Sequence, residues 1–127
     1  MSNLCKRILV VDDAATVRMY HRTILESAGF SVAEAINGIE ALEKALLTPF
    51  DLYLVDVNMP KLDGYGFLRE LRRQAIVQAP AVMISTEAQA KDRSKAYVSG
   101  ANYYLIKPIK PQELLALSRL LLGMAEG

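Results

Sequence analysis

The sequence has 127 residues, of which 52% are hydrophobic, and its 15 Lys and Arg nearly balance 14 Asp and Glu. This length suits one domain with a single core, and the balanced charge gives no indication of binding to nucleic acid or to a membrane surface. No apolar run reaches the roughly 20 residues of a membrane span. The single Cys5 cannot form an internal disulfide, so we expect a protein of the reducing cytoplasm.

The first half of the chain alternates apolar runs with amphipathic stretches. Residues 7–11 predict a buried strand that ends at Asp12 and Asp13, and residues 14–28 predict a helix that stops at Gly29. Residues 31–35 predict a weaker strand, and a second helix follows the turn at Asn37 and Gly38. The residues expected to face the core are Val17, Tyr20, Ile24 and Ala28 in the first helix, and Ile39, Leu42, Ala45 and Leu46 in the second.

The second half repeats this alternation. A buried strand over 52–55 leads to Asp56, and Pro60 keeps the residue before it out of helical geometry, so a loop follows. The remaining predicted elements are helix 65–73, strand 81–84, helix 87–98, strand 103–106 and helix 111–122. In the last helix, Leu114, Leu117 and Leu121 are expected to pack inward, whereas Leu115 and Leu122 form either a partner-binding edge or part of a wide core stripe.

Five strands that alternate with five helices predict an α/β fold with a five-stranded parallel sheet and helices on both faces. Right-handed crossovers and a switch point beside the first strand give a doubly wound, flavodoxin-like order 2-1-3-4-5. Parallel strands end at the same edge of a sheet, so the residues at four strand ends should share one crevice. They are Asp12, Asp13, Asp56, Ser85 and Lys107.

The three carboxylates of this crevice would repel one another, so the cluster requires a cation. Oxygen ligands without a nearby His or Cys favour Mg2+. With Mg2+ and Lys107 to neutralise charge, and the hydroxyl of Ser85 as a donor, Asp56 is suited to accept a phosphoryl group as a nucleophile. Each residue alone has a simpler interpretation as a cap, a turn residue or a surface charge, but their common position favours a functional site.

Four strings, ILVVDD, LYLVDVNMPKLDG, AVMISTEA and GANYYLIKPI, resemble the receiver domain of bacterial two-component response regulators, in the right order. The resemblance implies one receiver domain over 1–127 without an effector domain. It implies that Asp56 accepts a phosphoryl group from a sensor histidine kinase. It also implies that Asp13, Asp56 and the carbonyl of Asn58 bind Mg2+, with Asp12 acting through water.

The resemblance assigns further roles near the crevice. Ser85 and Lys107 would contact the phosphoryl group, and the peptide between Lys107 and Pro108 would be cis. Ser85 and Tyr104 would form the switch. The positions that modulate phosphoryl lifetime would be Asn58, Thr86 and Glu87. Two residues depart from the common pattern, since Ser85 stands where threonine is commoner and Thr86 where a smaller residue is frequent.

Within the family, Asn58 and the sequence from Thr86 to Ala88 are most similar to CheY-type chemotaxis regulators. This likeness implies a signalling phosphoacceptor, which catalyses only its own phosphotransfer and autodephosphorylation. The expected output face consists of helix 87–98, the fifth strand and the last helix. Its expected target is a flagellar motor switch protein or a histidine phosphotransfer protein, and the expected state is a monomer or weak dimer.

Other functions remain open at this point. A phosphorelay shuttle or phosphate sink would use the same crevice chemistry. A phosphohydrolase of the haloacid dehalogenase type is disfavoured because Asn58 stands where those enzymes need a second aspartate. A pseudo-receiver is disfavoured because all the crevice residues are present. His21 lies among apolar residues of the first helix, so we interpret it as a packing residue.

Overall fold

The computed structural model describes residues 6–124, in which five strands and five helices alternate. Cys5 lies outside the described residues. The strands are β1 (Arg7–Val11), β2 (Ser31–Ala35), β3 (Leu52–Asp56), β4 (Ala81–Ser85) and β5 (Tyr103–Ile106). The helices are α1 (Ala15–Ser27), α2 (Gly38–Leu47), α3 (Gly64–Arg73), α4 (Ala90–Ser99) and α5 (Pro111–Leu121). The helices of this described part are too short or too polar to traverse a bilayer.

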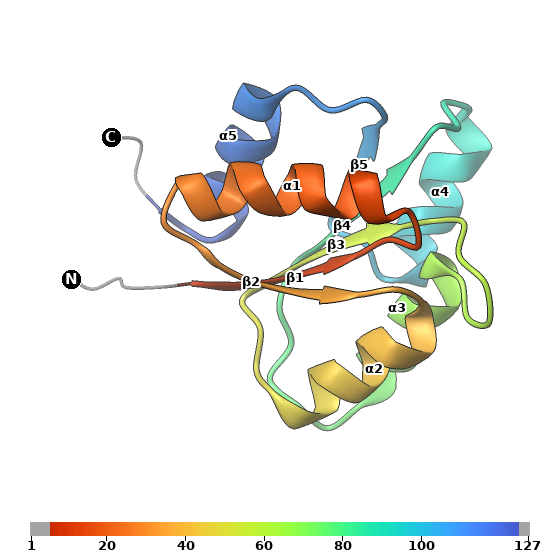
Figure 1. Ribbon diagram of the computed structural model, residues 1–127. Helices are drawn as coiled ribbons and strands as arrows, with labels where there is room; N and C mark the ends of the chain where they lie inside the picture. The colour runs from red at the N-terminus through yellow and green to blue at the C-terminus, as the bar shows by residue number, and fades with distance from the viewer. Residues whose placement is uncertain (1–5, 125–127) are drawn as a thin grey trace.

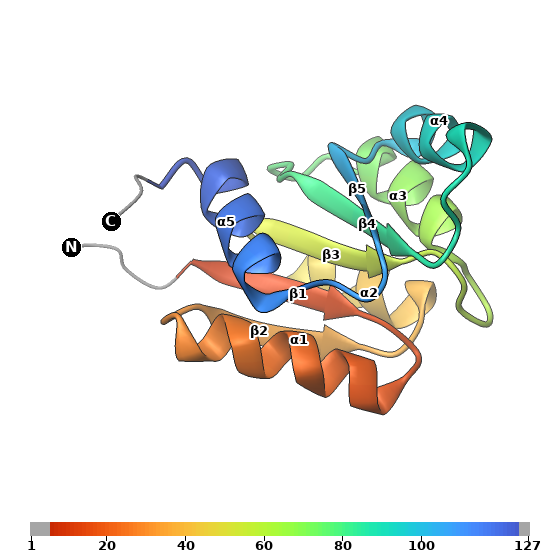
Figure 2. The same cartoon turned by 90° about the horizontal axis from the view of Figure 1, so that it is seen from above.

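The strands form one parallel sheet in the order β2-β1-β3-β4-β5, with helices on both faces (Figure 1), which confirms the predicted flavodoxin-like fold. Figure 2 shows from above that α1 and α5 lie on one side of the sheet, while α2, α3 and α4 lie on the other. Two core clusters follow from this arrangement. One cluster joins Leu9, Tyr53 and Met83 to α2, α3 and α4, and the other joins Ile8 and Leu54 to α1 and α5.

The three central strands β1, β3 and β4 are buried on both faces, which explains their nearly continuous apolar sequences. All five residues of β3 and all five of β4 are buried. The edge strand β2 is less buried, with only Val32 and Ala35 fully covered. Its weaker strand pattern is therefore the consequence of its position at the edge of the sheet.

Helix α3 begins directly against the carboxyl end of β3. Asp63 caps the helix by accepting a hydrogen bond from the amide of Gly66 at 2.8 Å. The amide of Gly64 donates to the carbonyl of Val57 at 2.9 Å. A Cβ at Gly64 would collide with the carbonyl oxygen of Asp56, so only glycine allows this close approach.

Helix α4 begins at Ala90 and not at Glu87, so this boundary of the sequence prediction is wrong. The hydroxyl of Ser85 accepts a hydrogen bond from the amide of Glu87 at 3.0 Å. The hydroxyl of Tyr104 donates to the carbonyl of Glu87 at 2.7 Å. These bonds replace the helical hydrogen bonds of Glu87, and the chain over 86–89 is a loop.

The predicted core stripes of two helices were also partly wrong. In α1, His21 and Leu25 are buried, whereas Tyr20 is 45% exposed, and its hydroxyl donates to the carbonyl of Ile109 at 3.2 Å. In α2, the buried side chains are Ala41 and Ala45, while Ile39 and Leu46 are 45% and 47% exposed. Large side chains of the strands already fill this layer of the core, so α2 packs mainly through small residues, together with the predicted Leu42, which is partly buried.

Helix α5 packs through a wide apolar stripe. Leu114 is fully buried, and Leu117 and Leu121 pack against the same cluster, as do Leu115 and Leu122. Of the two interpretations of Leu115 and Leu122, the structure therefore favours the wide core stripe. The exposed leucine of this helix is Leu120.

Arg72 of α3 ties together the loops that precede β4 and β5. Its Nε and Nη2 donate to the carbonyl of Gly100 at 3.1 and 2.9 Å, and its Nη1 donates to the carbonyl of Ala79 at 2.8 Å. Nη2 also donates to the side chain of Asn102, which in turn accepts from the amide of Ala81. Burial lowers the pKa of Arg72 from its usual value. In the folded protein, backbone carbonyls therefore take the place of water as the main hydrogen-bond acceptors of this guanidinium.

We expect Arg72→Ala to lower the free energy of unfolding by about 2 kcal/mol, because it leaves several partly buried acceptors unpaired. Urea denaturation would measure the loss. Arg73→Ala is the matched control, since Arg73 makes only an exposed ion pair with Glu70 and should change stability by no more than about 0.5 kcal/mol. Equal losses in the two variants would contradict the role assigned to Arg72.

Candidate functional site

Strand register brings the predicted site residues to one edge of the sheet. Val11 of β1 lies opposite Val55 of β3, so Asp12 and Asp56 follow at the same level. Asp56 lies opposite Ile84 of β4, which places Ser85 one residue further along. The amide of Lys107 donates to the carbonyl of Ser85 at 2.8 Å, so β5 delivers the lysine to the same edge.

Three carboxylates form a cluster at this edge. Asp12, Asp13 and Asp56 each offer an oxygen atom, and these atoms lie within 4.8 Å of one another. Asp12 and Asp56 are buried, whereas Asp13 is exposed. Oδ1 of Asp12 accepts a hydrogen bond from the amide of Ala14 at 2.9 Å, which holds the turn between β1 and α1. The cluster is therefore open to solvent on the side of Asp13.

Lys107 lies against two of these carboxylates. Its Nζ donates to Oδ1 of Asp56 at 2.7 Å and to Oδ2 of Asp12 at 3.1 Å. One ammonium against three carboxylates leaves two negative charges in the cluster. A donor set made only of oxygen atoms and carrying this charge fits a hard divalent cation such as Mg2+. The peptide between Lys107 and Pro108 is cis, as the family resemblance implied.

The surroundings shift the pKa values of the two charged partners upward. Burial raises the pKa of Asp56, and the charges of Asp12 and Asp13 raise it further, against the opposing hydrogen bond from Lys107. Burial alone would lower the pKa of Lys107, but its bonds to Asp56 and Asp12 outweigh this effect and raise it. Lys107 therefore stays protonated at neutral pH, and a further cation would help Asp56 to stay ionised.

Ser85 and Tyr104 meet at the backbone of Glu87. Ser85 is buried and accepts from the amide of Glu87, while Tyr104 is buried and donates to the carbonyl of the same residue. The guanidinium of Arg93 lies 5.4 Å from the centre of the Tyr104 ring and covers it. Tyr104 already points inward in this structure. Asn58 and Thr86 are exposed beside the site, and their roles stay predictions.

The structure adds residues that sequence reasoning did not connect to the site. Arg18 of α1 donates to the carbonyl of Asp12 at 2.7 Å. A hollow of about 230 Å3 borders Lys107 and is lined by Thr16, Val17, Tyr20, His21, Pro108 and Ile109. His21 is 3% exposed and burial lowers its pKa, which supports its interpretation as a packing residue. The local sequence shows no pattern that identifies the contact of Arg18.

Comparison with known proteins agrees with this site. The sequence model of the family described as "Response regulator receiver domain" matches residues 8–119. A curated relative, "Probable transcriptional regulator ycf27" of Cyanophora paradoxa, is 40% identical over 122 residues, which are 96% of this chain and 50% of that protein. The chain thus spans about half the length of the first curated relatives it matches.

Two solved structures are similar over almost their whole length. The chemotaxis protein CheY4 of Vibrio cholerae is 33% identical, with a TM-score of 0.88 over 93% of this chain and 99% of that one. The receiver domain of the sensor histidine kinase PA1611 of Pseudomonas aeruginosa is 31% identical, with a TM-score of 0.88 over 94% and 99%, and holds a magnesium ion in its active site cleft. The chain therefore belongs to the family of receiver domains of two-component response regulators.

Proposed function

We propose that Asp56 accepts a phosphoryl group from a sensor histidine kinase in the cytoplasm and that this group changes a protein-binding face. The observation that carries the proposal is the place of Asp56 at the end of a buried strand, beside the other two carboxylates and in direct contact with the ammonium of Lys107. A carboxylate in this position is a nucleophile whose surroundings can neutralise the charge of an incoming phosphoryl group.

In the proposed reaction, a carboxylate oxygen of Asp56 forms a bond to phosphorus while the bond from phosphorus to the donor nitrogen breaks, and the histidine keeps the electron pair. Asp13, Asp56 and the carbonyl of Asn58 would hold Mg2+, with Asp12 acting through water. Bound Mg2+ would neutralise the phosphoryl oxygens. Lys107 and the hydroxyl of Ser85 would bind the same oxygens as donors. Asn58, Thr86 and Glu87 lie where they could influence how long the adduct lasts.

The switch would use the two hydrogen bonds at Glu87. A phosphoryl group adds about 1.5 to 2 negative charges and three acceptor oxygens, which attract the hydroxyl of Ser85. A shift of Ser85 alters its bond to the amide of Glu87, and Tyr104 holds the carbonyl of the same residue. The phosphoryl group would thus bias the position of the loop over 86–89.

The proposed output face consists of α4, β5 and α5, with the loop over 86–89 beside it. Val98 is 88% exposed there, and Tyr97 and Tyr103 are 46% and 44% exposed. We propose that this face binds a chemotaxis target of the flagellar motor switch type, in keeping with the likeness to CheY4. The rival role is a relay shuttle, in which a histidine phosphotransfer protein takes the phosphoryl group from Asp56.

Incubation with acetyl phosphate and Mg2+ should add one phosphoryl mass to the protein, as intact-mass spectrometry would show. Asp56→Asn should abolish the adduct, because an amide oxygen is a poor nucleophile and carries no charge. Asp51→Asn is the control, since Asp51 precedes the other end of β3 and, among residues 6–124, its side chain accepts a hydrogen bond from the amide of Arg7 alone. An adduct that persists in Asp56→Asn would place the acceptor elsewhere.

Replacement of Lys107 should separate catalysis from metal binding. In Lys107→Met, we expect adduct formation to slow by at least about 100-fold, because a charged donor to the transferring group is lost. Mg2+ should bind as tightly or more tightly, because the ammonium that pairs with Asp56 and Asp12 is gone. Stopped-flow phosphorylation and titration calorimetry would measure the two effects. Weaker Mg2+ binding would show that Lys107 organises the carboxylates and does not compete with the cation.

The switch predicts a variant that keeps the chemistry but loses part of the signal. Tyr104→Phe should accept the phosphoryl group at an unchanged rate, because its hydroxyl bonds only to the carbonyl of Glu87. It should bind a flagellar motor switch protein several-fold more weakly after phosphorylation, as fluorescence anisotropy would report. Tyr53→Phe serves as a control for the loss of a hydroxyl, because Tyr53 is a buried residue of β3 and β3 is not part of the output face. Transfer of the phosphoryl group to a histidine phosphotransfer protein, without binding to the motor protein, would support the relay role.

A further inference from the structure

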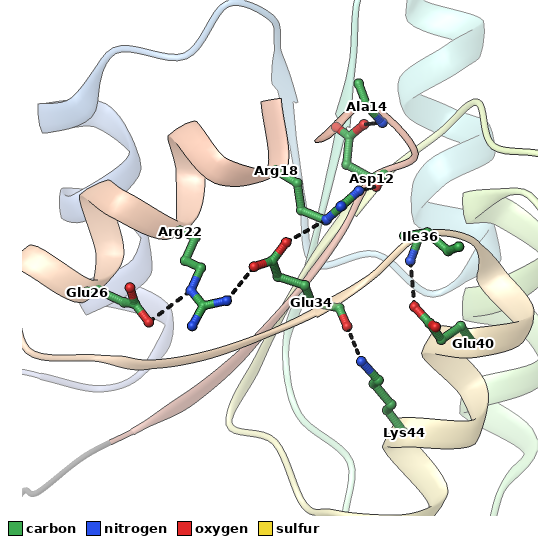
Figure 3. A network of polar contacts seen from close by, with 9 residues as sticks. All are labelled: Asp12, Ala14, Arg18, Arg22, Glu26, Glu34, Ile36, Glu40 and Lys44. Carbon is green, nitrogen blue, oxygen red and sulfur yellow. Dashed lines mark hydrogen bonds and ion pairs between the residues drawn. The ribbon is translucent and has the colours of Figure 1, made fainter. Parts of the chain in front are cut away.

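Arg18 of α1 joins the turn after β1 to the edge strand β2 (Figure 3). Its Nη1 donates to the carbonyl of Asp12 at 2.7 Å, and its Nε donates to the carboxylate of Glu34 at 2.6 Å. The guanidinium is a rigid planar group, so its bond to Glu34 determines the direction in which it meets Asp12.

Glu34 is a firm anchor for this guanidinium. The side chains of Arg18 and Glu34 are only 15% and 26% exposed, so the pair is sheltered from water. Arg22 binds the second oxygen of the same carboxylate, and Lys44 of α2 binds the carbonyl of Glu34 (Figure 3). One residue of β2 is therefore held from helices on both faces of the sheet.

The backbone of Asp12 is held on two sides. Its amide donates to the carbonyl of Ala35 in β2 at 3.1 Å, and its carbonyl accepts from Arg18. This carbonyl belongs to the peptide unit that joins Asp12 to Asp13, and the unit is planar. A hydrogen bond that fixes the oxygen of this unit therefore also fixes the amide of Asp13. It thereby restrains the position from which the exposed Asp13 side chain extends.

We propose that Arg18 is a positioning residue for the cation site, acting through the Asp12 carbonyl and held in place by Glu34. The inference rests on the proposed function, because it assumes that Asp13 and its neighbours bind Mg2+. Glu34 and Glu26 together balance the charges of Arg18 and Arg22, so the arrangement orients the ligands without leaving an unpaired positive charge beside a cation. Groups that orient metal ligands in this way commonly change metal affinity by about 10- to 100-fold when they are replaced.

The test is the dissociation constant of Mg2+, measured by titration calorimetry on the full chain at a temperature where circular dichroism shows each variant to be folded. Arg18→Met should weaken Mg2+ binding about tenfold. The direction of the change in Mg2+ affinity is decisive. If the guanidinium of Arg18 acted only through its positive charge, its removal would strengthen Mg2+ binding. Arg22→Met is the matched control, since it removes the other guanidinium from Glu34 without touching Asp12, and should change the constant less than about twofold.

Two further variants test how Arg18 acts. Arg18→Lys keeps the positive charge, but its ammonium lacks the planar guanidinium that reaches both the Glu34 carboxylate and the Asp12 carbonyl. It should therefore lose most of the Mg2+ affinity that Arg18→Met loses. When Glu34→Met is combined with Arg18→Met, it should cause no further loss of Mg2+ affinity, because Glu34 acts through Arg18. Unchanged or tighter Mg2+ binding in Arg18→Met, or full affinity in Arg18→Lys, would overturn the inference.

Asp13→Asn separates failure of the inference from failure of the proposed site. If Asp13→Asn weakens Mg2+ binding and Arg18→Met does not, the metal site stands and only the role of Arg18 is wrong. If neither variant weakens binding, the cation site itself is wrong. In a purely structural role, Arg18→Met would lower the melting temperature of the metal-free protein and leave the dissociation constant of the folded protein unchanged.

Discussion

The mutual repulsion of three carboxylates at one edge of the sheet is the constraint on which the rest of this structure depends. Parallel register places Asp12 and Asp56 side by side, and the turn after β1 adds Asp13. The bonds of Lys107 to Asp56 and Asp12 compensate one of the three charges. The remaining charge is an unfavourable feature of the folded state in the absence of a cation, and the same feature makes the cluster chemically suited to a divalent cation.

The two sides of the site are built differently. Toward β2, the turn at Asp12 is held by Arg18, which is in turn bound to Glu34, and charge-assisted bonds of this kind are the stronger ones. At the loop over 86–89, the bonds from Ser85 and Tyr104 to Glu87 are neutral hydrogen bonds, whereas the charge-assisted bonds of Lys107 go to the carboxylates and not to this loop. Helix α4 follows that loop and buries only Ala96 and Ser99. A new charge at Asp56 would therefore displace the loop over 86–89 at a lower cost in free energy than the turn at Asp12.

The sequence was sufficient for the order of the strands and for the convergence of Asp12, Asp13, Asp56, Ser85 and Lys107, because parallel strands share one carboxyl edge. It was not sufficient for details that depend on packing. The start of α4 was misplaced because the bonds that Ser85 and Tyr104 make to Glu87 compete with helix formation, and the Tyr104 bond crosses 17 residues. In the stripes of α1 and α2, Ile24, Ala28, Leu42 and Ala45 pack against the core as predicted. The prediction was wrong for Tyr20, Ile39 and Leu46, because helical periodicity does not show which neighbouring side chains already fill the core.

The contact of Arg18 with Asp12 illustrates what no local pattern contains. Arg18 and Glu34 lie 16 residues apart, and their side chains meet only because α1 packs beside β2 after the chain has turned at Gly29. The same crossover that makes the sheet parallel brings the acid of an edge strand to a helix that begins beside the carboxylate cluster. In this fold, topology thus supplies both the convergence of the carboxylates and a support for the backbone of one of them, so the turn at Asp12 and the sheet edge at Glu34 are held by the same guanidinium.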